Sequence, residues 1–164
     1  MVETKKLTRS AILIAVGIVV PFIFHNFGLP GNVFLPMHFS PLIAGFLVGP
    51  LYAAGVGAIL PLLNFAISGM PPMPMAALMM VELAIFGLVT ALLDQKLDWG
   101  LLPSLIIAIL AGRVVYHFLQ VVIVMEFTNP LPLIAGGIAT GLPGIIGQLV
   151  LVPIIVWAIR EARN

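Results

Sequence analysis

The sequence predicts an all-α integral membrane protein of six transmembrane helices, formed by one domain over residues 1–164. Of its 164 residues, 62% are hydrophobic and only 8% are charged, which is more apolar than a soluble domain of this length needs. The apolar residues fall into long runs separated by segments rich in proline and glycine. If the chain crosses the membrane six times, the six basic residues outside these runs all lie on one side, as the positive-inside rule favours.

The six helices are expected at about residues 8–24, 39–49, 51–68, 75–93, 101–125 and 141–159. The second and third are divided at Gly49-Pro50, because proline can begin a helix but disrupts the interior of one. The second helix is too short to cross a hydrocarbon layer of about 30 Å alone. We therefore expect it to be tilted, or extended by an ordered part of the segment before it.

The basic residues favour six spans over five. With five spans, Lys96, Arg160 and Arg163 would lie outside the cell. With six, one side holds every basic residue except Arg113, and the positive-inside rule makes that side, with both termini, cytoplasmic. The residues concerned are Lys5, Lys6, Arg9, Lys96, Arg160 and Arg163.

Arg113 is a charge inside an apolar run. If that run is a helix, Arg113, His117 and Gln120 share one face at positions i, i+4 and i+7, with Tyr116 beside them. Because an arginine in lipid is costly, it normally faces a protein interior or a wet cavity. Arg113 could neutralise Glu82, or it could hold an anionic or carbonyl group of a ligand. The two can coexist, and a paired arginine would suit a neutral ligand.

Placing each polar residue by its depth, at about 1.5 Å per residue, gathers the polar groups of helices 3 to 6 in the outer half of the bundle. This distribution predicts a cavity that is open to the outside and sealed from the cytoplasm. Ordered outer loops, over residues 25–39, 68–74 and 126–140, are expected to cap it. The candidate binding residues are Arg113, His117, Gln120, Glu82, Asn64, Gln148, Tyr116 and, from the caps, His38 and Asn129.

Several of these residues have a structural alternative. Asn64 and Gln148 could each be hydrogen-bonded glue between helices rather than ligand contacts. The outer methionines could bind a soft metal such as Cu(I), or they could form a flexible wall around a ligand; these are Met70, Met73, Met75, Met79 and Met80.

The chain carries no enzyme signature and no cysteine. It has no HExxH, GxSxG or P-loop pattern and no paired-carboxylate cluster, so we expect no catalysis and no cofactor. The absence of cysteine excludes disulfides and thiolate metal sites.

Four parts of the sequence resemble the substrate-binding S component of energy-coupling-factor (ECF) vitamin transporters. They are the stretch LPMHFSPLIAGFLVGP over residues 35–50, PLL over 61–63, SGMPP over 68–72, and the following Glu82. The resemblance extends over essentially the whole chain, including its length, its six spans and the Gly-Pro break.

This resemblance implies a subunit of a bacterial or archaeal cytoplasmic membrane that captures a micronutrient on the outside with high affinity. Its partners would be a transmembrane coupling subunit and two ABC-type ATPases, which would hydrolyse the ATP. The family's Ala-xxx-Ala motif, which contacts the coupling subunit, matches Ala11 and Ala15. The proposed family mechanism, in which the subunit topples in the membrane, suits a mostly apolar exterior.

The identity of the vitamin does not carry over from the resemblance, and pantothenate, folate and riboflavin types stay open. Typical riboflavin-binding members have Asp-Phe-Ser followed by Lys-Asn. Here His38-Phe-Ser40 lacks the aspartate, and Asn64 follows leucine. An anion such as pantothenate or folate would give Arg113 a role.

Three other functions compete with this one. A self-sufficient secondary transporter or channel is disfavoured, because no ionisable relay crosses the cytoplasmic half and no inverted repeat is evident. Soft-metal transport is a minor alternative. A scaffold subunit without a ligand would leave the outer polar cluster unexplained.

Overall fold

The computed structural model describes residues 3–123 and 130–162, and the regular elements in this part of the chain are helices joined by short turns and loops. Five of its helices are long and apolar enough to cross a membrane, and residues Gly31–Leu47 form a shorter apolar helical segment. An all-α chain with six membrane helices fits this result. The elements are α1 (Glu3–Asn26), α2 (Gly31–Phe34), the 3₁₀ turn η1 (Pro36–His38), α3 (Phe39–Leu47), α4 (Pro50–Ser68), α5 (Met75–Ala91), the π-helical turn η2 (Leu92–Lys96), α6 (Leu101–Ile123) and α7 (Pro130–Glu161).

The break between the second and third predicted helices is confirmed. α3 ends at Leu47, Gly49 has a φ of +94°, and Pro50 is the first residue of α4. Glycine is suited to this position because a side chain would be strained at such a positive φ. The short helix is also extended as expected, since α2 and η1 precede it, joined through Leu35 in the left-handed conformation.

The last helix is longer than the sequence predicted. We expected it at 141–159 and a cap over 126–140, but α7 runs from Pro130 to Glu161 with Pro143 and Pro153 inside it. Proline is favoured in the first turn of a helix, and membrane helices tolerate internal proline and glycine where neighbouring groups satisfy the backbone. The prediction of a cap loop over 126–140 is therefore wrong from residue 130 onward, where the chain is helical.

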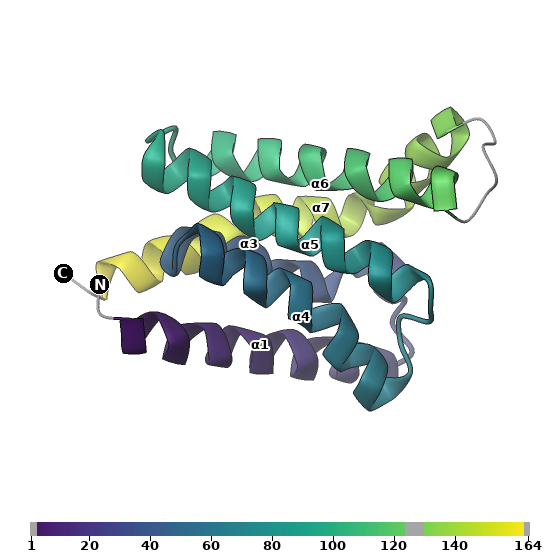
Figure 1. Ribbon diagram of the computed structural model, residues 1–164, viewed down its shortest axis with the longest axis horizontal. Coiled ribbons are helices and arrows are strands. Elements are labelled where there is room, and N and C mark those ends of the chain that lie inside the picture. Colours follow the sequence, from purple (N-terminus) through teal and green to yellow (C-terminus); the bar gives the residue numbers. More distant parts are fainter. Residues whose placement is uncertain (1–2, 124–129, 163–164) are drawn as a thin grey trace.

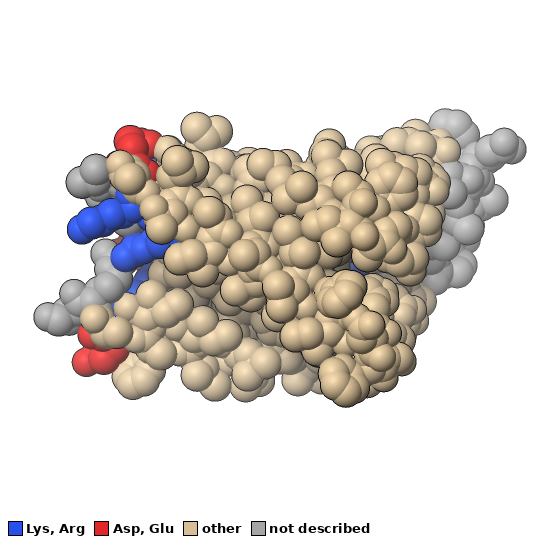
Figure 2. All heavy atoms as spheres, turned by 90° about the horizontal axis from the view of Figure 1, so that it is seen from below, with Lys and Arg blue, Asp and Glu red and all other residues tan. Residues whose placement is uncertain are grey.

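The long helices lie side by side along one axis, and the start of α1 and the end of α7 are at the same end of the molecule (Figure 1). Lysine and arginine side chains gather at that end, and most of the face seen in Figure 2 carries no charge. We call this the basic end and the opposite one the cavity end. Because α1 begins and α7 ends at the same end of the bundle, the chain must run along the bundle an even number of times, as six helices do.

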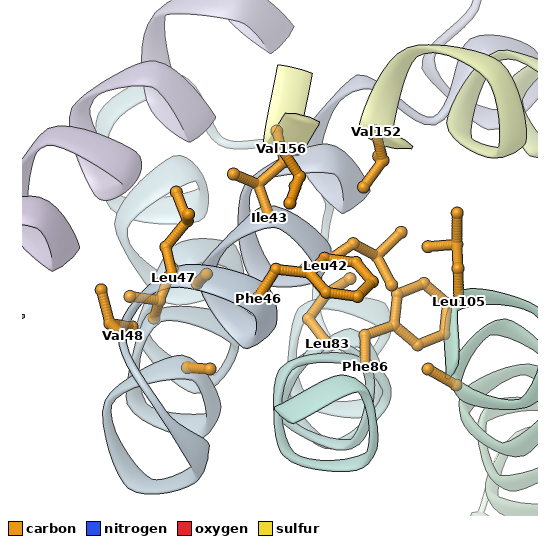
Figure 3. Packing of buried hydrophobic residues seen from close by; sticks show 14 of the residues in the cluster. Leu42, Ile43, Phe46, Leu47, Val48, Leu83, Phe86, Leu105, Val152 and Val156 are labelled. Carbon is orange, nitrogen blue, oxygen red and sulfur yellow. The ribbon is translucent and has the colours of Figure 1, made fainter. Parts of the chain in front are cut away.

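The short helix α3 lies at the centre of the bundle, and residues 40–47 are all buried. Its apolar side chains pack against those of α5, α6 and α7 (Figure 3). Close packing of this kind, with van der Waals contacts and small residues at crossings, is the main source of helix association in lipid. The labelled members of the cluster are Leu42, Ile43, Phe46, Leu47, Val48, Leu83, Phe86, Leu105, Val152 and Val156.

Candidate functional site

A cavity of about 610 Å³ lies at the cavity end of the bundle. Its walls come from the end of α1, from α2 and η1, from α4 to α7 and from residues 70–72. Asn32, Met70 and Pro72 line it and are themselves exposed, so the cavity reaches the surface there. Its volume is in the range of typical small-molecule sites.

A buried ion pair forms the base of the cavity. Arg113 Nη1 of α6 lies 3.2 Å from Glu82 Oε1 of α5, and the two residues are 7% and 1% exposed. On the other carboxylate oxygen, His38 Nε2 of η1 lies 3.6 Å from Glu82 Oε2. That separation is too long for a hydrogen bond, so His38 is a polar neighbour of the pair.

Arg113 keeps donors that the pairing does not use. Its Nε and Nη2 atoms are buried, and neither has a hydrogen-bond partner among the residues that the structure describes. Buried polar groups in proteins are nearly always bonded to protein or to ordered water. The guanidinium therefore has spare hydrogen-bonding capacity at the wall of the cavity.

Further along α6, polar side chains meet a sulfur atom rather than an oxygen. The Tyr116 hydroxyl donates to Met75 Sδ at 3.4 Å, and Gln120 Nε2 lies 4.0 Å from the same sulfur. His117 Nδ1 is 3.3 Å from Gln120 Oε1, while its buried Nε2 has no partner in the described part of the chain. A thioether is a weak acceptor, so these donors are only loosely engaged.

One side of the cavity is closed where α2 and the His117 ring pack against glycines of α7. A Cβ atom at Gly144 would lie 2.7 Å from the carbonyl carbon and oxygen of Phe34, and one at Gly137 would lie 2.3 Å from His117 Cε1. Such distances are far below van der Waals contact. The absent side chains therefore allow α2 and the His117 ring to lie directly against α7, which closes one side of the cavity.

Toward the basic end the bundle is closed. The members of the apolar cluster around α3 (Figure 3) that belong to α5 and α6 lie nearer the basic end than the cavity residues of the same helices: Leu83 and Phe86 follow Glu82 on α5, and Leu105 precedes Arg113 on α6. Beyond this cluster, Arg160 Nη2 of α7 pairs with Asp94 Oδ2 at 2.6 Å, and Gln95 Nε2 donates to the Gly45 carbonyl at 2.6 Å. These contacts tie η2 to α3 and α7, so the basic end of the bundle is held together by polar contacts as well as by apolar packing.

The family model described as "ECF transporter, substrate-specific component" matches residues 5–156. The chain belongs to this family. It is therefore a substrate-binding subunit of a transporter, and the family implies association with ECF transmembrane and ATPase subunits and with a small-molecule substrate. No curated protein and no solved structure matches the chain.

In this substrate-specific component, the structure brings seven of the nine candidate residues to one cavity. Gln148 is fully buried outside the lining, and its amide atoms have no hydrogen-bond partner among the described residues. Asn129 lies outside the described residues. The seven that line the cavity are Arg113, His117, Gln120, Glu82, Asn64, His38 and Tyr116.

Asn64 has the structural contact that the sequence allowed for it. Its Nδ2 donates to the Gly17 carbonyl at 3.1 Å and to the Leu60 carbonyl at 3.0 Å. The first hydrogen bond joins α4 to α1, as expected of a polar side chain that holds two membrane helices together.

Sequence reasoning did not single out His25, Asn32 and Thr140, which also line the cavity. All three lie in segments predicted as caps, the first two in 25–39 and Thr140 in 126–140, so their place in the chain was the available signal. Met70, Met75 and Met79 of the methionine cluster are lining residues. Among the described residues, no group of three or more histidines or carboxylates is arranged to hold a metal ion.

Proposed function

We propose that this substrate-specific component captures a water-soluble vitamin in the cavity from the outer side of the cytoplasmic membrane. The observation that carries the proposal is a cavity with a few polar side chains in a mostly apolar wall, located toward the end of the bundle opposite the basic residues. If the basic end is cytoplasmic, as the positive-inside rule predicts, the cavity faces the outside. Pantothenate, folate and riboflavin types are the candidate ligands.

Release into the cell would depend on partner subunits. The packed apolar cluster separates the cavity from the basic end. Among the described residues, the buried ionisable side chains either line the cavity or, in the case of Asp94, lie at the basic end, so none is placed between to relay a coupling ion. A self-sufficient secondary transporter needs a site that opens alternately to both sides. We propose that the coupling subunit and two ABC-type ATPases supply the energy, with Ala11 and Ala15, both exposed on α1, at the coupling contact.

The side chains around the cavity suit a small organic solute. Arg113, Tyr116, His117 and Gln120 supply hydrogen-bonding groups on one wall, and methionine and proline side chains supply apolar surface on the others. A few placed polar groups in an apolar wall are typical of small-molecule sites.

Uptake of radiolabelled vitamins by cells expressing this chain, with and without the coupling subunit and ATPases, tests the proposal. We expect binding at the cell surface from the chain alone and accumulation only with the partners. Accumulation at full rate from the chain alone would contradict it and favour a secondary transporter. Native mass spectrometry of the purified chain would identify a vitamin that co-purifies.

A further inference from the structure

We propose that the ligand of this cavity carries no net charge and binds mainly through hydrogen-bond acceptors, such as carbonyl oxygens or ring nitrogens. The inference rests on the proposed function and deepens it, because it selects a charge class from the vitamins that stayed open. It would disfavour carboxylates such as pantothenate and folate.

The first step is the charge of the lining. Among the described residues around the cavity, Arg113 is the single cation apart from histidine and Glu82 is the single carboxylate. They lie 3.2 Å apart, so with neutral histidines the formal charges of the wall sum to zero. The positive charge that would attract an anion is already compensated inside the protein.

The second step is the position of Glu82. Its carboxylate is at the base of the cavity and touches both Arg113 and His38, at 3.2 Å and 3.6 Å. A carboxylate or phosphate that approached Arg113 would meet this like charge in a poorly solvated site, where repulsion is strong. Moving an anion out of water without a free counter-charge is unfavourable.

The third step is the surplus of donors. Arg113 Nε and Nη2 have no hydrogen-bond partner in the described part of the chain. The donors of the Tyr116 hydroxyl and of Gln120 Nε2 contact the Met75 sulfur, while Gln120 Oε1 is already the partner of His117. An oxygen or nitrogen acceptor of a ligand would be a better partner for these groups than a thioether. An uncharged molecule rich in acceptors can satisfy the donors without adding charge.

Thermal stabilisation of the purified chain by matched ligand pairs tests the inference. The panel holds all water-soluble vitamins together with two pairs that differ in charge, riboflavin with its 5′-phosphate and pantothenol with pantothenate. For any pair that binds, we expect the uncharged member to bind at least about tenfold more tightly, which corresponds to about 1.4 kcal/mol. Across the whole panel, the strongest stabiliser should be uncharged.

Two different outcomes would contradict the inference that the ligand is uncharged, and only one of them would also contradict vitamin capture. A charged vitamin, anion or cation, as the strongest stabiliser would overturn the inference that the ligand is uncharged and leave vitamin capture intact. If no member of the panel stabilised the chain, vitamin capture itself would be contradicted, and the inference with it.

Variants of the pair test the physical reason. Glu82→Gln leaves Arg113 uncompensated, so the affinity ratio should shift toward the anionic member by about tenfold or more. The double variant Glu82→Gln/Arg113→Gln is neutral again and should return the preference to the uncharged member, even if its overall affinity is lower. An unchanged ratio in the folded single variant would overturn the inference.

Asp94→Asn is the matched control, because it also removes one carboxylate from an arginine pair. Asp94 lies at the basic end, bonded to Arg160 and outside the cavity lining. The ratio in this variant should equal that of the unmodified chain. An equal shift in Asp94→Asn and Glu82→Gln would show that net charge, and not the pair at the cavity, sets the preference, and would overturn the proposal.

Discussion

Burial decides how much Glu82 and Arg113 depend on one another. Each charged group is desolvated in the folded protein, and the attraction between them must offset that desolvation cost. Removing one partner leaves the other as a buried charge with no counter-charge, which is far less favourable than removing both. The pair at the basic end is different, because Arg160 keeps 40% of its side chain exposed and can be solvated.

We predict that Glu82→Ala lowers the free energy of unfolding by about 3–5 kcal/mol, because it leaves Arg113 as a buried charge without a counter-charge. The double variant Glu82→Ala/Arg113→Met should recover much of this loss. Asp94→Ala, which frees the partly solvated Arg160, should cost less than about 1 kcal/mol. Denaturant unfolding in detergent micelles measures all three, and equal losses at Glu82 and Asp94 would contradict the argument.

The sequence predicted the partnership of Arg113 and Glu82 but not its third member. Two opposite charges in apolar runs, about 6 Å apart in depth at 1.5 Å per residue, point to one another because lipid offers no alternative partner. His38 lies in a 3₁₀ turn, where no helical periodicity gives the direction of a side chain. Its place beside Glu82 depends on how η1 docks, which is a tertiary property.

At the scale of helices, glycine fixes how closely backbones approach. A Cβ atom at Gly57 of α4 would lie 2.0 Å from the Leu83 carbonyl oxygen of α5. The obstacle is backbone, which cannot rotate away as a side chain can. Without a hydrophobic driving force between helices in lipid, such close contacts contribute much of the packing energy.

Gly57→Ala should therefore separate α4 from α5 and lower the free energy of unfolding by about 1–3 kcal/mol, a typical cost of overpacking. Gly55→Ala is the control on the same helix, because a Cβ atom there has nothing within 4 Å. That variant should be neutral or slightly stabilising, since alanine favours helix. Thermal unfolding in detergent distinguishes the two, and similar midpoints would contradict the packing argument.

The contact between α7 and α2 makes a separate prediction about binding. Gly144→Ala should push α2 away from α7, because the new Cβ atom would lie 2.7 Å from the Phe34 carbonyl group. We expect ligand dissociation to become faster and affinity to fall by about tenfold, or about 1.4 kcal/mol, with Gly55→Ala again as the control. If the Gly144→Ala variant has normal helix content and binds the ligand as tightly as the unmodified chain, the contact between α2 and α7 does not retain the ligand.

The helices themselves were predictable to the extent that apolar runs and Gly-Pro breaks define them. The break before Pro50 follows from the backbone geometry of two residues, so local sequence was sufficient. The start of α7 was not, because a glycine such as Gly137 can break a helix in water yet pack inside one in a membrane bundle. Which of these occurs depends on a neighbour distant in sequence, here His117.

The whole molecule is asymmetric along its long axis. Among the described residues, one end carries the exposed charged side chains and the Arg160–Asp94 pair, and the other carries the cavity. The packed cluster around α3 lies between them (Figure 3). This arrangement suits a protein that holds a solute at one face and needs another subunit to release it, and it gives the orientation in the membrane a functional meaning.

The absence of cysteine from the sequence makes that orientation directly measurable. Met73 at the cavity end and Leu97 at the basic end are exposed and lie outside the cavity lining. In intact cells, a membrane-impermeant maleimide should label Met73→Cys, and it should label Leu97→Cys only after permeabilisation, because lysine and arginine favour the cytoplasmic side. The reverse pattern would place the cavity inside and contradict capture from the outside. Labelling of both in intact cells would contradict the six-span topology, because Met73 and Leu97 flank α5 and η2, and a single crossing between them must place the two residues on opposite sides.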